Sequence, residues 1–361
     1  MLPRTAKRLP LLLLAIVALV AGVAGGLQRL GWSVPAADGL ALDHGPLMIA
    51  GFLGTLITLE RAVALAKPWA FVAPVLSGLG ALALLAGIPH PLPSLLASAA
   101  ALLLVVECGL IVAAQAAWFS ATMAAGAGCW LIGNLAWLRG QPIPVVVSWW
   151  VAFLVLTIAG ERLELSRVVQ VPRAARSAFV GIAVTLLAGL ALGGLAFPAG
   201  ARVVGFAFLG FAVWFGRYDV ARRTVRQRGL TRFMAVCLLS GYVWLGVAGL
   251  LALHAGAMAG GFTYDAVLHA VLLGFVFAMI FGHAPVIFPA VLGIAIPFSP
   301  AFYGHLGLLH ASLIARILGD VWYAQPLRSW GSLFNALAVV LFFANTVRQV
   351  RVGLRQNPAG R

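Results

Sequence analysis

The chain has 361 residues, of which 63% are hydrophobic and only 9% are charged. Soluble domains are close to half apolar and about a quarter charged, so this composition excludes an ordinary soluble protein and indicates an integral membrane protein. The formal net charge of +15 would suggest nucleic acid in a soluble protein. Here the basic residues lie between apolar stretches, which is the pattern of membrane orientation, and we expect no nucleic-acid partner.

Apolar runs of roughly twenty residues, long enough to cross a bilayer, recur along the whole chain. The first follows Arg4, Lys7 and Arg8, as in a signal peptide, but it has spanning length and lacks an obvious small-residue cleavage site, so we interpret it as retained. We predict twelve spans: 9–27, 44–66, 69–88, 93–114, 117–138, 142–160, 177–197, 200–216, 232–253, 264–289, 300–322 and 327–347. The sequence therefore predicts an all-α, polytopic membrane helix bundle, with residues 1–361 forming a single transmembrane domain in the lipid bilayer.

The distribution of basic residues predicts how this bundle is oriented. With both termini in the cytoplasm, nineteen Lys and Arg fall on the inner side and four on the outer side, with Arg316 inside a span. The largest groups lie at 162–176 and 217–232. Cytoplasmic loops of membrane proteins carry an excess of Lys and Arg, so this count favours an even number of spans and two cytoplasmic termini.

The second span places a histidine at the outer surface. Its sequence begins LDHGPLMIAGFLGTL, in which Asp43 is a suitable N-cap and Pro46 suits a first helical turn. His44 lies between them. Neutral imidazole binds iron, copper and zinc alike, so His44 is a candidate ligand whose metal the residue type alone does not select.

Acidic residues of the fourth and sixth spans are weaker candidates. Glu107 lies within the fourth span, where it is either a proton-relay carboxylate or a protonated, hydrogen-bonded group. Glu161, Arg162 and Glu164 close the sixth span, and we expect them to form a solvated network.

The tenth span contains two histidines, His269 and His283, fourteen positions apart in an uncharged run. In an ideal α-helix they lie about 40° apart on one face and about 21 Å apart along the axis. Pro285 should kink the helix just after His283. Each ring either holds a ligand or bonds a neighbouring carbonyl. His44 and His269 fall at a similar depth near the outer side, where they could supply axial nitrogens to opposite faces of one haem.

The eleventh span adds His305, His310, Arg316 and Asp320. His305 lies at the depth of His283 and His310 is nearer the middle, about 140° around the helix from His305. These three histidines are candidates for a second metal or haem. Arg316 either pairs with Asp320, one turn further on, or holds a haem propionate.

Two stretches and the twelve-span layout resemble the NnrS proteins, twelve-helix bacterial membrane proteins that bind haem and copper and are linked to nitrosative-stress resistance. DHGPLMIAGFLGTLI is similar to their second helix, and LHAVLLGFVFAMIFGH to a later helix. The resemblance implies haem at His44 and His269, with His283 as a further ligand, in a bacterial inner membrane. The family's His-x-His pattern has Leu42 here, which weakens the expectation of copper. There is no CxxCH motif, so we expect a b-type haem.

The function predicted first is therefore that of a haem-binding membrane protein, with copper as a further candidate cofactor, that handles nitric oxide or nitrosative stress. A small gaseous or other small-molecule ligand and a redox partner would follow, while enzymatic turnover and oligomeric state stay open. The alternative is a proton-coupled transporter of a small solute or metal, since intramembrane His and Glu suit proton coupling. A third hypothesis is an assembly partner within a larger respiratory complex.

Overall fold

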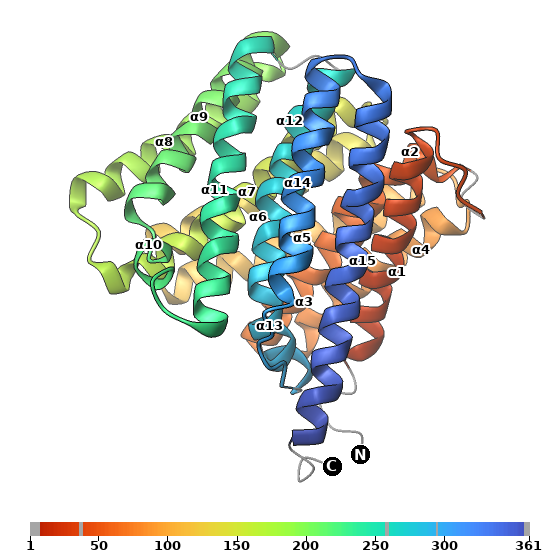
Figure 1. Cartoon of the computed structure of the whole chain (residues 1–361). Coiled ribbons are helices and arrows are strands. Elements are labelled where there is room, and N and C mark those ends of the chain that lie inside the picture. Colours follow the sequence, from red (N-terminus) through yellow and green to blue (C-terminus); the bar gives the residue numbers. More distant parts are fainter. Residues whose placement is uncertain (1–7, 36–38, 257–259, 294, 357–361) are drawn as a thin grey trace. The chain divides into compact units, whose positions relative to one another are not determined.

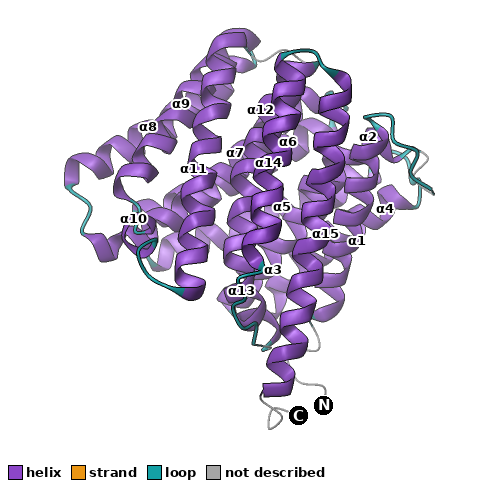
Figure 2. Cartoon of the chain, viewed as in Figure 1, coloured by secondary structure: helices purple, strands orange, loops and turns teal. Residues whose placement is uncertain are grey.

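The computed structural model of the chain describes residues 8–35, 39–256, 260–293 and 295–356, with the backbone alone at 290–292 and 356. Arg4 and Lys7, which precede the first predicted span, lie outside the described residues. The described part of the chain contains helices and connecting loops and no β-strand (Figure 2). The predicted all-α architecture is therefore confirmed.

The chain forms two compact units, Met1–Gly160 and Glu161–Arg361, and the boundary falls inside one helix. The elements up to that helix are α1 (Leu9–Gln28), α2 (Leu40–Pro46), the π-helix η1 (Leu47–Leu53), α3 (Gly54–Leu65), the 3₁₀-helix η2 (Pro68–Phe71), α4 (Val72–Leu85), α5 (Leu92–Ala114), α6 (Trp118–Leu138) and α7 (Ile143–Leu165). The remaining elements are the 3₁₀-helix η3 (Ser166–Val169), α8 (Arg173–Gly193), α9 (Phe197–Tyr218), α10 (Ala221–Thr224), α11 (Gly229–Ala255), α12 (Phe262–His269), the π-helix η4 (Ala270–Phe277), α13 (Ala278–Leu292), α14 (Phe302–Val321) and α15 (Gln325–Gln356). The single domain over 1–361 stays a prediction.

Eleven helical segments among the described residues are long and apolar enough to cross a membrane, and the chain is a multi-pass membrane protein. They correspond one to one with the predicted spans apart from 300–322. That stretch is also one helix, α14, but its two histidines, one arginine and one aspartate leave it less apolar than the others. The cytoplasmic location of both termini stays a prediction.

The start of the second span differs from the sequence-based prediction. The helix begins at Leu40, with Gly39 as its N-cap in the left-handed region at φ 85°, so Asp43 lies inside the first turn and caps nothing. Pro46 lies inside the helix, and the π-helix η1 follows it directly. Proline has no N–H to give to the hydrogen-bond ladder, so the regular α pattern is already interrupted at this point.

A second π-helix, η4, directly follows His269 in the tenth span. A π-helix closes i to i+5 hydrogen bonds and is often found at functional sites. The 40° offset predicted between His269 and His283 assumed an unbroken α-helix, and it does not apply across η4. The helix α13 then continues through Pro285 and Pro289 to Leu292.

Within the first unit, glycines of α1 allow the segment that contains His44 to pack closely against this helix. A Cβ at Gly25 would collide with the carbonyl oxygen of Leu40, and one at Gly22 would lie 2.7 Å from the Met48 sulfur. Small residues let membrane helices approach closely, because no side chain separates their backbones. The run of glycines near the end of α1 therefore determines how near α2 and η1 lie to it.

Candidate functional site

The imidazole of His44 packs against the glycine-rich end of α1. Its Nδ1 lies 2.6 Å from the carbonyl oxygen of Gly22. Gly26 leaves room for the ring, since a Cβ there would be 2.8 Å from His44 Cε1. A carbonyl only accepts hydrogen bonds, so Nδ1 carries the proton and Nε2 has the lone pair that a metal needs.

His269 has the same tautomer in the second unit. Its Nδ1 lies 2.9 Å from the carbonyl oxygen of Asp265, one turn earlier in α12, and 3.4 Å from a carboxylate oxygen of the same residue. Histidines that bind metals typically donate their second N–H to a carbonyl or carboxylate, which orients the ring and increases the basicity of the other nitrogen. Asp265 is thus suited to orient His269.

Arg316 pairs with Asp265, and the predicted pair with Asp320 is wrong. Arg316 Nε donates to Asp265 Oδ2 at 3.0 Å, and Nη2 donates to Oδ2 at 2.8 Å and to Oδ1 at 3.1 Å. This is the planar fork that matches guanidinium to carboxylate. The fork leaves Arg316 committed to a carboxylate of its own chain, so the geometry lends no support to its predicted contact with a haem propionate.

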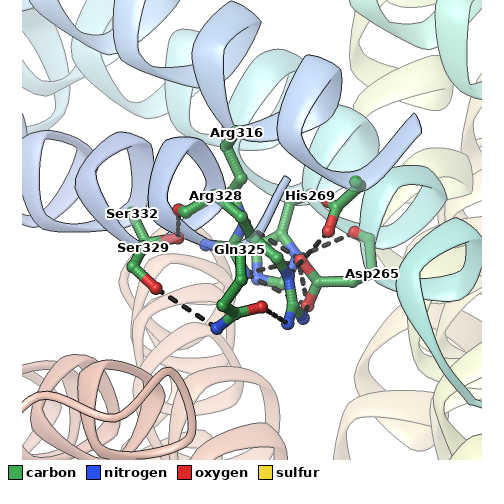
Figure 3. A network of polar contacts seen from close by, with 8 residues as sticks. Asp265, His269, Arg316, Gln325, Arg328, Ser329 and Ser332 are labelled. Atoms are coloured by element: carbon green, nitrogen blue, oxygen red, sulfur yellow. Dashed lines mark hydrogen bonds and ion pairs between the residues drawn. The ribbon is translucent and has the colours of Figure 1, made fainter. Parts of the chain in front are cut away.

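Asp320 has Arg328 of α15 as its partner instead. Arg328 Nε and Asp320 Oδ1 are 2.6 Å apart, without the alignment of a hydrogen bond. Arg328 Nη2 is also 3.4 Å from Asp265 Oδ1. Figure 3 shows how Asp265, Arg316 and Arg328 lie together, with Gln325, Ser329 and Ser332 around Arg328. Two carboxylates and two guanidiniums therefore form one network that joins α12, α14 and α15.

Two glycines allow this network to form. A Cβ at Gly319 of α14 would lie 2.5 Å from the backbone nitrogen of Arg328, and one at Gly331 of α15 would lie 2.6 Å from that of Arg316. Each glycine thus faces the backbone of an arginine on the other helix, where α14 and α15 run side by side (Figure 1). The close approach keeps both arginines beside the aspartates, and their formal charges cancel in a mostly buried place.

His310 and His305 have the opposite tautomer. Trp244 Nε1 donates to His310 Nδ1 at 3.0 Å, and His310 Nε2 lies 2.9 Å from the Ser240 hydroxyl. The Asn345 amide lies 3.2 Å from His305 Nδ1. A ring whose Nδ1 accepts carries its proton on Nε2, so neither histidine presents Nε2 to a metal.

His305 is also enclosed by aromatic rings. Phe281, Phe302 and Phe342 have centroids at 4.9 to 5.6 Å from its ring, and only 1% of the residue is exposed. Its Nε2 is buried without a hydrogen-bond partner among the described residues.

His283 resembles His269 in its local bonding, because its Nδ1 lies 2.8 Å from the carbonyl oxygen of Met279. The three predicted ligands of a second metal, His283, His305 and His310, have separate partners. In the described part of the chain, no three His, Cys, Asp or Glu side chains converge as a metal site would require. A second metal there stays a prediction without geometric support.

Two further polar residues differ from expectation. Arg162 is 3% exposed and lies 3.9 Å from the buried carboxylate of Asp219, so it is not part of a solvated network. Glu107 is fully buried, and neither carboxylate oxygen has a hydrogen-bond partner within the described residues. The described residues therefore supply no partner for the hydrogen-bonded state of Glu107, and both hypotheses for this residue stay predictions.

Asp265 and Arg328 are the site residues that sequence reasoning missed. Asp265 lies four positions before His269, and this spacing is the only signal in the sequence that could have identified it. Arg328 was counted merely as an outer charge. Their partners lie on other helices, and spacing along one helix does not reveal such contacts.

Residues 8–351 match the model of a family described as "Domain of unknown function (DUF8744)". No curated protein and no solved structure matches the chain.

Proposed function

The chain belongs to the family described as Domain of unknown function (DUF8744), and we propose that it is a haem-binding protein of a bacterial inner membrane. His269 in the second unit and His44 in the first would hold a b-type haem through their imidazole nitrogens. The use of this haem for nitric oxide, and copper as a further cofactor, rest on the resemblance to NnrS proteins alone.

The observation that carries the proposal is the tautomer of the predicted ligands. Both His269 and His44 give the Nδ1 proton to a backbone carbonyl, so the lone pair of each ring is on Nε2, the tautomer in which metal-binding histidines are commonly held. His310 and His305, in contrast, accept at Nδ1. The joint binding of one haem by His44 and His269 links residues of two units and stays a prediction.

The surroundings of His269 favour a ligand over a packing residue. Asp265 is fixed by the guanidinium of Arg316, so its carbonyl and carboxylate hold the imidazole in one orientation. The π-helix η4 begins at the next residue. A bound haem would supply an iron centre that takes an electron or a small gaseous ligand, and Asp265 acts on it as a positioning residue through His269.

The absorption spectrum of the purified full-length protein tests the proposal. We expect a Soret band that shifts on reduction and again on adding nitric oxide, with iron present at a fixed ratio to protein. The pyridine haemochrome should be that of a b-type haem. Colourless protein without iron, after expression with excess haem, would contradict the proposal.

Glu107 favours a second candidate function, proton-coupled transport. An intramembrane carboxylate that is fully buried without a hydrogen-bond partner is costly, and such residues often mark proton pathways. On this alternative, vesicles containing the protein take up solute in response to a proton gradient, and Glu107→Gln abolishes the uptake. Vesicles whose uptake equals that of empty vesicles for a panel of small solutes and metal ions would rule against it.

A further inference from the structure

A cavity of about 670 Å³ opens beside the end of α9, far along the chain from the histidines discussed above. One side is the segment 169–172, which connects η3 to α8. The other side is basic and is lined by Arg217, Tyr218, Asp219, Arg222, Arg223 and Arg226. Four arginines therefore border one hollow in the second unit.

Local structure gathers these arginines from a single stretch of chain. The helix α9 ends at Tyr218, and Asp219 adopts an extended backbone conformation. Its Oδ1 accepts a hydrogen bond of 2.7 Å from the backbone nitrogen of Ala221, where the short helix α10 begins. The chain thus turns back at Asp219, and the arginines that follow lie beside Arg217 and do not continue away from it.

The four guanidiniums have no counter-ion of their own. None of them lies within ion-pair distance of a carboxylate among the described residues, and all four are exposed. Two contacts restrain the first two of them: Arg222 Nη1 donates to the carbonyl oxygen of Arg217 at 2.7 Å, and the Arg217 guanidinium lies 5.3 Å from the centroid of the Tyr218 ring. Asp219 is the acidic residue of the lining, but it is 2% exposed and its Oδ2 lies 3.9 Å from Arg162. Arg162 therefore offsets the charge of Asp219 within the protein, and the cavity stays strongly positive.

We propose that this cavity binds a phosphate group, with Arg223 and Arg226 as principal donors. A guanidinium presents N–H groups in a planar fork that matches phosphate oxygens, and several of them around one hollow give a site of defined geometry. The predicted orientation puts the cavity on the cytoplasmic side, where both anionic phospholipid headgroups and soluble phosphate compounds occur. The site is independent of haem binding.

The test compares two double variants that remove the same charge from the same segment. Arg223→Gln/Arg226→Gln alters the cavity lining and leaves in place the bond from Arg222 to the Arg217 carbonyl. Arg228→Gln/Arg232→Gln is the matched control, since both residues are exposed and lie outside the cavity lining. The full-length protein is used throughout.

Two probes distinguish the sources of phosphate. For a soluble source, the thermal midpoint of the detergent-purified protein is followed as inorganic phosphate replaces chloride at constant ionic strength. For a lipid source, the protein is placed in nanodiscs of phosphatidylcholine, with or without phosphatidylglycerol. It is then released from the nanodiscs, and the lipids that it retains are counted by native mass spectrometry.

In the wild type and the control we expect phosphate to raise the midpoint, phosphatidylglycerol to be retained, or both. Retention alone assigns a headgroup, and a midpoint shift alone assigns a soluble ligand. The cavity variant should bind about 30-fold more weakly, which corresponds to about 1 kcal/mol for each of two arginines. Equal losses in the two double variants would show a diffuse basic surface and overturn the proposal. So would a wild type that distinguishes neither phosphate from chloride nor phosphatidylglycerol from phosphatidylcholine.

Discussion

Substitution of Asp265 by Asn should destabilise the second unit strongly. The carboxylate accepts three hydrogen bonds of 2.8 to 3.1 Å from Arg316 and lies 3.4 Å from Arg328. Its side chain is 17% exposed and that of Arg316 is 9% exposed, so both charges are largely removed from water. Removing one partner of a buried ion pair costs about 3–5 kcal/mol, because the remaining charge is left uncompensated. We expect about 3 kcal/mol, the low end of this range, since Asp320 still faces the two arginines.

The assay is the unfolding free energy in mixed detergent micelles titrated with sodium dodecyl sulfate. The double variant Asp265→Asn/Arg316→Gln should recover about 2 kcal/mol of the loss, because no buried guanidinium is then unpaired. Glu164→Gln, an exposed carboxylate of α7, is the control and should change stability by less than about 0.5 kcal/mol. If Asp265→Asn costs no more than this control, or if the double variant recovers nothing, the network does not stabilise the fold as reasoned here.

Three further predictions concern other places in the chain. Gly319→Ala should cost about 2 kcal/mol or more in the same unfolding assay, because its Cβ would lie 2.5 Å from a backbone nitrogen of α15. The control Gly307→Ala, whose Cβ would have no atom within 4 Å, should be neutral or slightly stabilising, and equal effects would contradict the close approach of the two helices. Glu107→Gln should leave the unfolding free energy unchanged or raise it, since within the part of the chain that the structure describes neither carboxylate oxygen has a hydrogen bond to lose. A loss of more than about 1 kcal/mol would show a stabilising partner for the charge. His310→Ala should cost about 1–3 kcal/mol by leaving the Trp244 N–H unpaired, and a fully retained stability would contradict that bond.

The sequence was sufficient for the membrane helices because bilayer thickness requires apolar runs of about twenty residues, and these are visible one at a time. The largest difference lies in the twelfth span, where α15 continues past the predicted end at residue 347 to Gln356. Another lies in the sixth span, whose predicted end is residue 160. There α7 continues to Leu165, because Arg162 finds a buried partner in Asp219 and need not reach water. The helix α14 is recognisable for a related reason, since its two histidines, its arginine and its aspartate are spaced among apolar residues.

The site was predicted less completely because its contacts join different helices. Spacing within one helix offered Asp320 as the partner of Arg316, whereas the actual partner, Asp265, is 51 positions away. The predicted angle of 40° between His269 and His283 loses its basis for a second reason. It assumed 100° per residue, and the π-helix between them follows another hydrogen-bond pattern. Hydrophobic periodicity gives no sign of either feature.

Haem binding at His269 is tested by the haem content per chain of His269→Ala, compared with that of His310→Ala. Both variants remove an imidazole from the second unit, but only His269 has the tautomer that leaves Nε2 to iron. We predict that the Soret band and the iron disappear in His269→Ala and persist in His310→Ala. A band that survives the loss of His269 unchanged, at the same iron-to-protein ratio, would contradict the assignment of this histidine as a haem ligand.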